Sequence, residues 1–226
     1  MKSALAWIAM AMLATPVVAA PRLNAPGTCP TGTKLVELAS RAFSNVPDLK
    51  DAKIQTQHLV CRALRAGAPT WLLTFADPGC GGLGAGAAAI VENGVVTWRQ
   101  PGFFAPGTPC RGATWEPADL DGDGNDELLL FEDDERHDGS GHRSLAVMAI
   151  ANGKPSDGGG LALSSRGSAE GDGRYTWDCS AIYRLVPGPR RSQQIELVGR
   201  GHVADQGCPE DGRHVYAWRA GKLIEP

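Results

Sequence analysis

The chain has 226 residues, of which 42% are hydrophobic, and its formal net charge at pH 7 is −3. This length is sufficient for one domain with a substantial core. The mildly acidic balance, without a run of basic residues, argues against nucleic acid and anionic membrane surfaces as partners.

The first 19 residues have the features of a secretory signal peptide. Lys2 supplies the positive charge, Ala4–Thr15 forms an apolar core, and Val17-Val18-Ala19 is a small-residue cleavage site. The apolar stretch is too short for a membrane span. We therefore expect a single mature domain at residues 20–226, periplasmic or secreted and not inserted into a membrane.

Six cysteines follow the signal peptide, and this even number predicts three disulfides formed in an oxidising compartment. No C-x-x-C pair occurs, so the sequence gives no support to a thiolate zinc site or a redox motif. The spacing does not choose among the pairings. The candidate disulfide cysteines are Cys29, Cys61, Cys80, Cys110, Cys179 and Cys208.

A short helix is expected over Lys34–Val46, where apolar residues recur at helical spacing between Thr33 as N-cap and Pro47. From about Lys53 onward, short strands alternate with turns. The expected strands are His58–Leu64, Thr70–Phe75, Ala87–Val91, Val95–Trp98, Leu128–Phe131, Ser144–Ile150, Tyr175–Val186, Gln194–Val198 and His214–Trp218. The expected tight turns are Glu92-Asn93-Gly94, Ala151-Asn152-Gly153 and Ala220-Gly221.

These strands form three similar sets, at about residues 53–104, 109–157 and 175–226. Ala76–Cys80 matches Ala204–Cys208 at four of five positions. The glycine-rich segment 156–173 is expected to be a flexible connector. The pattern predicts an all-β fold of repeated antiparallel meanders, either propeller-like or a sandwich, because three copies fall short of the four blades of a closed propeller.

Acidic residues and glycines alternate over 119–127, directly before the apolar run Leu128–Phe131. With Asp119 as position one, carboxylates fall at positions one, three, five and nine, and a backbone carbonyl at position seven. Gly124 at position six permits a sharp turn. This pattern predicts a Ca²⁺ site. The candidate metal ligands are Asp119, Asp121, Asp123, Asn125 and Glu127.

The pattern does not fit an EF-hand, because position twelve is Leu130 instead of a bidentate Glu and the flanks are not helical. The loop instead resembles the FG-GAP or VCBS repeat of integrin-type propellers, whose signature D-x-D-G-D-G-x-x-D precedes an apolar strand. Glu127 stands where that family usually has Asp. The resemblance implies a β-repeat protein with calcium as a structural cofactor.

A second candidate site follows that strand and is rich in acids. It is either a solvated edge or a docking surface for a basic partner. Ser140-Gly141 is similar to the Ser-Gly loop that exported lysozyme inhibitors and immunity proteins insert into the enzyme's cleft, although the downstream tyrosine is absent. The candidate partner residues are Glu132, Asp133, Asp134, Glu135, Asp138, Ser140, Gly141 and His142.

The sequence contains no G-x-S-x-G elbow, H-E-x-x-H helix or P-loop, so we expect no enzyme and assign no catalytic residue. The leading expectation is a calcium-binding interaction module whose partner is a protein or glycan in the cell envelope or outside the cell. An inhibitor or immunity protein against a peptidoglycan hydrolase is the first alternative. An unrecognised hydrolase is the second.

Overall fold

A computed structural model describes residues 28–46, 49, 54–65, 69–76, 86–104, 113–135, 140–167, 177–203 and 206–226. The predicted signal peptide, Cys80, Cys110 and Asp138 lie outside these residues, as does the first part of the strand expected from Tyr175. No helix among the described residues is long and apolar enough to cross a membrane.

Among the described residues, strands make up the structure apart from the helix α1 and short 3-10 segments, which confirms the predicted all-β fold class. The first sheet consists of β1 (Leu59–Ala63), β2 (Thr70–Ala76), β3 (Gly86–Glu92) and β4 (Val95–Pro101). The second consists of β5 (Phe103–Phe104), β6 (Ala113–Ala118), β7 (Glu127–Glu135), β8 (Gly141–Ala151), β9 (Lys154–Gly167), β10 (Trp177–Pro187), β11 (Gln193–Arg200), β12 (Gly212–Arg219) and β13 (Lys222–Ile224).

Strands neighbouring in each sheet are also neighbours in the chain, and all pairs are antiparallel except β5 with β6. Four successive antiparallel strands occur three times, as β1–β4, β6–β9 and β10–β13. The last two sets form one continuous sheet, because β9 pairs with β10. Neither sheet closes on itself within the described residues, so the structure shows meanders and not a closed propeller.

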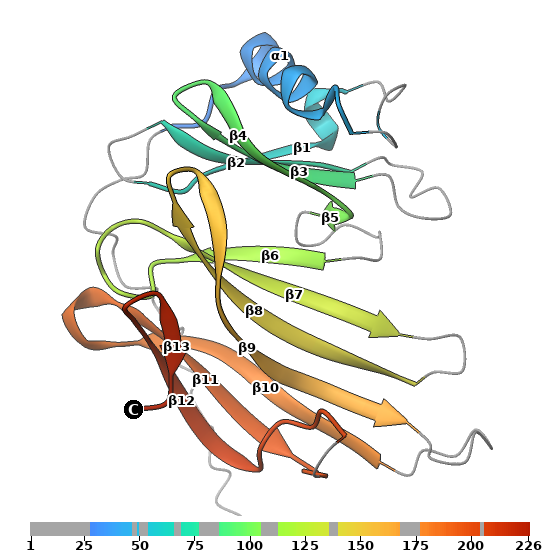
Figure 1. Ribbon diagram of the computed structural model, residues 1–226, viewed down its shortest axis with the longest axis vertical. Helices are drawn as coiled ribbons and strands as arrows, with labels where there is room; N and C mark the ends of the chain where they lie inside the picture. The colour runs from blue at the N-terminus through green and yellow to red at the C-terminus, as the bar shows by residue number, and fades with distance from the viewer. Residues whose placement is uncertain are drawn as a thin grey trace, which may run out of the picture.

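Three apolar clusters hold these elements together. Figure 1 shows the arrangement of the elements around them, with the helix on one side of the first sheet and the nine-stranded sheet on the other. The first lies between α1 (Gly32–Phe43) and one face of the β1–β4 sheet, and includes Phe43 and Phe75. The second lies between the opposite face of that sheet and β6–β8, around Trp115. The third lies within the curved nine-stranded sheet, where Leu129 and Leu145 are buried together with residues of β11 and β12.

The helix begins and ends earlier than predicted. It starts at Gly32 with Thr31 as its N-cap residue, so Thr33 lies inside the helix, and it ends at Phe43 instead of Val46. The helical apolar stripe itself is confirmed, since Leu38, Ala39, Ala42 and Phe43 are buried. The three predicted tight turns are also confirmed, because both central residues of each have positive φ: Asn93 and Gly94, Asn152 and Gly153, Ala220 and Gly221.

The prediction of a flexible connector at 156–173 is wrong over its first twelve residues, since β9 extends from Lys154 to Gly167. The glycines there make room for aromatic rings. A Cβ at Gly158 would collide with the ring of Trp218, and a Cβ at Gly167 would collide with the ring of Trp177. Glycine in a strand often marks such a close approach. Residues 168–173 lie outside the described part of the chain.

Two disulfides are formed by the described cysteines. Cys29–Cys61 joins the segment before α1 to β1, with a Cα–Cα distance of 6.0 Å. Cys179–Cys208 joins β10 to the segment before β12, with a Cα–Cα distance of 5.7 Å. These two bonds support residence in an oxidising compartment. The 3-10 helices η2 (Thr56–His58) and η3 (Pro189–Arg191) precede β1 and β11.

Candidate metal centre

The predicted calcium loop connects β6 to β7, and the cross-strand pair Ala118–Glu127 closes it. Gly122 and Gly124 have φ values of 80° and 89°, in the left-handed region where glycine is favoured. Leu120 is 2% exposed and belongs to the core of the curved sheet. The loop is therefore anchored at its first turn by an apolar side chain.

The structure brings together the three aspartates of the loop. One carboxylate oxygen from each of Asp119, Asp121 and Asp123 lies within 4.8 Å of the others. Two oxygens that share a Ca²⁺ ion at about 2.3–2.6 Å lie at most about 5 Å apart. The separation therefore fits ligands of one calcium ion.

Backbone N–H groups hold these carboxylates in place. Asp119 is 8% exposed and accepts hydrogen bonds from the N–H groups of Gly122 (2.8 Å) and Gly124 (3.1 Å). Asp123 accepts from the backbone N–H of Asn125 (2.7 Å) and from its side-chain amide (2.8 Å). The loop thus orients its carboxylates with its own backbone, although the side-chain amide of Asn125 is turned toward Asp123.

Glu127 is buried beside the three aspartates but is not within 4.8 Å of all of them. Its Oε2 accepts a hydrogen bond of 2.8 Å from the N–H of Leu120. Burial raises the pKa of Glu127 to about 8, and the charges of Asp121, Asp123 and Asp119 add to the increase. Burial also raises the pKa of Asp121. This concentration of carboxylates favours either protonation or a bound cation. The assignments of Asn125 and Glu127 as ligands stay predictions.

One side of the loop contacts the first sheet region. The N–H of Asp126 donates a hydrogen bond of 2.8 Å to the carbonyl of Leu64, the residue that follows β1. Arg65 and Asn125 form an isolated antiparallel bridge. These contacts join the loop to a segment about sixty residues earlier in the chain.

The other side of the loop contacts the connection between β10 and β11. The N–H of Gln193 donates a hydrogen bond of 2.9 Å to the carbonyl of Asp119. A Cβ at Gly122 would lie 2.6 Å from the carbonyl oxygen of Arg190, so the two backbones are in close contact. The sequence contains no local signal for these contacts, because they depend on how the three sets of strands meet.

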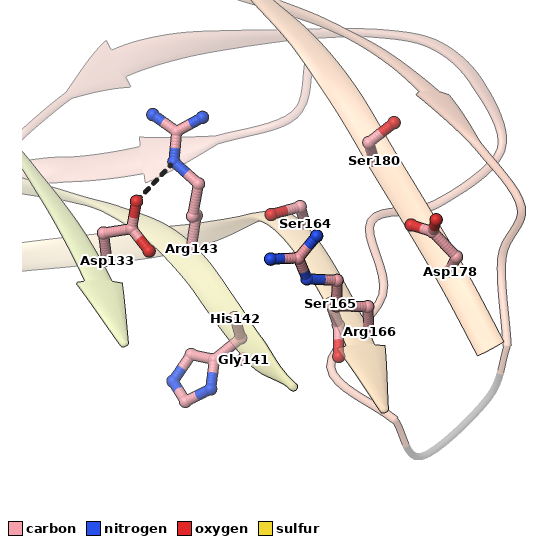
Figure 2. Close-up of a pocket in the computed structure, with 9 residues that line it drawn as sticks. All are labelled: Asp133, Gly141, His142, Arg143, Ser164, Ser165, Arg166, Asp178 and Ser180. Atoms are coloured by element: carbon pink, nitrogen blue, oxygen red, sulfur yellow. Dashed lines mark ion pairs between the residues drawn. The ribbon is translucent and has the colours of Figure 1, made fainter. Parts of the chain in front are cut away.

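Part of the predicted partner segment lines a polar hollow at the ends of β7, β8, β9 and β10 (Figure 2). The hollow has a volume of about 300 Å³ and includes Asp133, Gly141 and His142. Asp133 and Arg143 form an ion pair of 3.6 Å, and each side chain is about half exposed. The structure does not describe the side chains of Asp134 and Glu135.

Residues that the sequence did not single out complete this hollow. Ser164 and Arg166 come from β9, and Asp178 and Ser180 from β10. Cross-strand pairing explains why they meet, since Ser164 pairs with both Arg143 and Ser180. Hydroxyls and charges of both signs suit a polar ligand, such as a glycan or the charged side chains of a protein.

No protein-family model matches the chain, and comparison with curated proteins gives no significant match. The resemblance to FG-GAP or VCBS repeats therefore rests on the loop at 119–127 and the strand that follows it. The structure supplies the geometry on which the functional proposal depends.

Proposed function

We propose that this chain is an exported calcium-binding β-repeat protein that acts as an interaction module, with calcium in a structural role. The position of the loop carries the proposal. Within eight residues, Asp119 accepts a hydrogen bond from the start of β11 and Asp126 donates one to the residue after β1. A cation that fixes the conformation of this loop therefore also stabilises the contacts through which β1–β4, β6–β9 and β10–β13 meet.

The donor set favours calcium over a transition metal. The loop offers carboxylate and carbonyl oxygens and contains neither histidine nor cysteine. Ca²⁺ prefers oxygen ligands in a flexible geometry, whereas zinc and copper prefer imidazole or thiolate. Asp119, Asp121 and Asp123 would hold the ion, and Glu127 would complete the set through its longer side chain.

Bound calcium would supply positive charge to a group of carboxylates that otherwise repel one another. Extracellular calcium modules have dissociation constants of roughly 10⁻⁴–10⁻³ M. A ten- to hundredfold excess of calcium over that constant stabilises the fold by about 1.4–2.7 kcal/mol. For a domain of this size, the melting temperature then increases by about 3–10 °C.

The interaction surface in this proposal is the polar hollow at the ends of β7–β10 (Figure 2). It contains Asp133, Gly141 and His142, which the sequence singled out as partner residues. The loop stabilises the same sheet from the start of β7, and the hollow includes the other end of that strand. The proposed partner is a protein or glycan of the envelope or of the extracellular medium.

Thermal melting in calcium and in chelator tests the calcium half of the proposal. We expect calcium to raise the melting temperature of the wild type and of Glu132→Gln, an exposed acid outside the loop. Asp121→Ala should lose the response. An equal response in wild type and Asp121→Ala would contradict the proposal.

Capture from a native envelope extract tests the binding half. Calcium-loaded protein should retain a partner that Arg143→Ala loses and that Arg219→Ala, an exposed arginine on β12, keeps. Capture that is equal with all three proteins would place the binding surface elsewhere. Protection of a muramidase by the purified protein would favour the inhibitor alternative.

A further inference from the structure

A second group of metal-ligating side chains lies far from the calcium loop in sequence. Nitrogen or oxygen atoms of Glu210, His214 and Glu225 all lie within 4.8 Å of one another. The Nδ1 atom of His214 is 2.8 Å from Oε1 of Glu225 and 3.7 Å from Oε2 of Glu210. This group contains an imidazole, which the calcium loop lacks.

The other ring nitrogen of His214 determines what Nδ1 can do. Nε2 lies 3.0 Å from the backbone carbonyl of Asp211. A carbonyl only accepts hydrogen bonds, so Nε2 carries the proton. Nδ1 therefore faces two carboxylates, which also accept, and a cationic species must lie between them: a proton or a metal ion.

We propose that His214, Glu210 and Glu225 bind a divalent transition-metal ion such as Zn²⁺. The Nδ1 atom and one oxygen from each carboxylate are the ligands. Zinc ligands lie about 2.0–2.2 Å from the ion and thus about 3–4 Å from one another, close to the observed separations. A histidine ligand whose second N–H is donated to a backbone carbonyl is the usual arrangement at metal sites.

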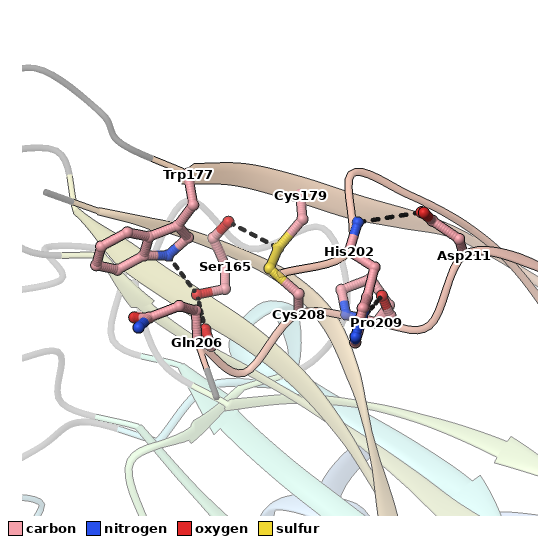
Figure 3. Close-up of a disulfide and its surroundings, with 8 residues drawn as sticks. All are labelled: Ser165, Trp177, Cys179, His202, Gln206, Cys208, Pro209 and Asp211. Carbon is pink, nitrogen blue, oxygen red and sulfur yellow. Dashed lines mark hydrogen bonds between the residues drawn. A yellow bond between two sulfur atoms is a disulfide. The ribbon is translucent and has the colours of Figure 1, made fainter. Parts of the chain in front are cut away.

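The segment that carries Glu210 is held in place independently of any ion (Figure 3). The Cys179–Cys208 disulfide attaches it to β10. The N–H of His202 donates a hydrogen bond of 3.1 Å to Oδ1 of Asp211. These constraints lower the entropic cost of bringing the ligands together.

A glycine on the neighbouring strand makes this position possible. Gly199 pairs with Gly212, and a Cβ at Gly199 would collide with the carbonyl oxygen of Glu210. The backbone of Glu210 therefore packs directly against β11. His214 is in β12, and Glu225 follows β13, the strand that pairs with β12. The ligands thus come from two stretches, Glu210–His214 and Glu225, which the pairing of β12 with β13 brings together.

The site is open to solvent on one side. The side chains of Glu210 and Glu225 are 67% and 49% exposed, whereas that of His214 is 19% exposed. The ring of Tyr216 stacks beside the His214 ring, with centroids 6.5 Å apart. Water can complete the coordination shell, and the ion reaches the site without a change in fold.

A proton competes with the metal for Nδ1. The hydrogen bonds to Asp211 and Glu225 raise the pKa of His214, which favours the protonated ring at lower pH. Zinc binding must therefore be measured at neutral or slightly alkaline pH. A protein that uses the group only as an ion pair will show no saturable zinc binding.

The test is a calorimetric titration of the full chain with Zn²⁺ in excess calcium, so that the acidic loop does not contribute. We expect a single saturable zinc site, weakened at least about tenfold by His214→Ala and by Glu225→Gln. His142→Ala, which removes an exposed histidine in the polar hollow, should bind zinc as the wild type does. Absence of saturable binding, or equal binding by wild type and His214→Ala, would overturn the proposal.

A structural readout shows that the variants remain folded and separates this site from the calcium loop. Zinc should slow hydrogen exchange in β13 of the wild type, because Glu225 follows that strand directly, and should not do so in His214→Ala. The two variants should keep the melting behaviour of the wild type in calcium. Asp121→Ala should keep zinc binding, so failure of the calcium proposal and failure of this one are distinguishable.

Discussion

Calcium removal and a rise in pH should destabilise the protein together, through Glu127. In the unfolded chain this carboxyl has the ordinary glutamate pKa of 4.5, and in the metal-free fold its pKa is about 8. Between these values the folded state binds more protons than the unfolded state. The contribution of Glu127 to the free energy of unfolding is therefore complete below pH 4.5 and is lost as the pH rises through 8.

The size of this effect follows from the pKa values. Each pKa unit corresponds to about 1.4 kcal/mol, so a change from 4.5 to about 8 corresponds to at most about 5 kcal/mol. Even half of that value would lower the melting temperature by about 5–10 °C. Calcium should suppress the effect, because a cation beside Glu127 stabilises its ionised form.

Tryptophan fluorescence during thermal unfolding, in chelator and in calcium across this pH range, measures the effect. Glu127→Gln is the matched control, because it keeps a neutral side chain of the same shape. In chelator, the wild type should lose stability with rising pH more steeply than the variant does. Identical slopes for the two proteins would refute the role assigned to Glu127.

Substitutions at Gly122 and Gly158 test two close contacts of the backbone, and Gly94→Ala serves as the control for the first. Gly122→Ala should cost about 2 kcal/mol or more in the free energy of unfolding measured by urea denaturation, since its Cβ would lie 2.6 Å from the Arg190 carbonyl. Gly94→Ala shares the positive φ but has open space, so it should cost only about 1 kcal/mol; equal costs would show that the collision is relieved. Gly158→Ala should destabilise the fold and change the fluorescence of Trp218, whose ring occupies the space. An unchanged spectrum and midpoint would contradict that packing.

The elements that could be predicted from sequence are those with local signals. The tight turns at Asn93 and Asn152 follow from residues that tolerate positive φ. β9 could not be predicted, because glycines such as Gly158 and Gly167 are typical of a flexible segment when only the neighbouring sequence is considered. The aromatic rings that pack beside these two glycines explain why they lie in a strand. The sequence does not predict β6 either, because Pro117 interrupts the local strand pattern. In the sheet, Pro117 nevertheless pairs with Leu128 of β7.

The candidate site likewise has features that the sequence predicts and features that it does not. The alternation of Asp119, Asp121 and Asp123 with glycine is a local pattern, and the structure brings these three carboxylates together. The contacts of the loop with Leu64 and Gln193 are long-range and have no counterpart in the sequence pattern. The group of Glu210, His214 and Glu225 has no local sequence motif either, because Glu225 approaches the other two only when β13 pairs with β12.

The central claim is that calcium at one loop stabilises the meeting point of three sets of strands. Hydrogen exchange at two amides tests it directly: the N–H of Asp126, bonded to Leu64, and the N–H of Gln193, bonded to Asp119. Calcium in hundredfold excess over its dissociation constant should slow exchange by up to about 100-fold at both amides. Unchanged exchange at both, or slowing confined to the loop while Gln193 exchanges as before, would contradict the claim.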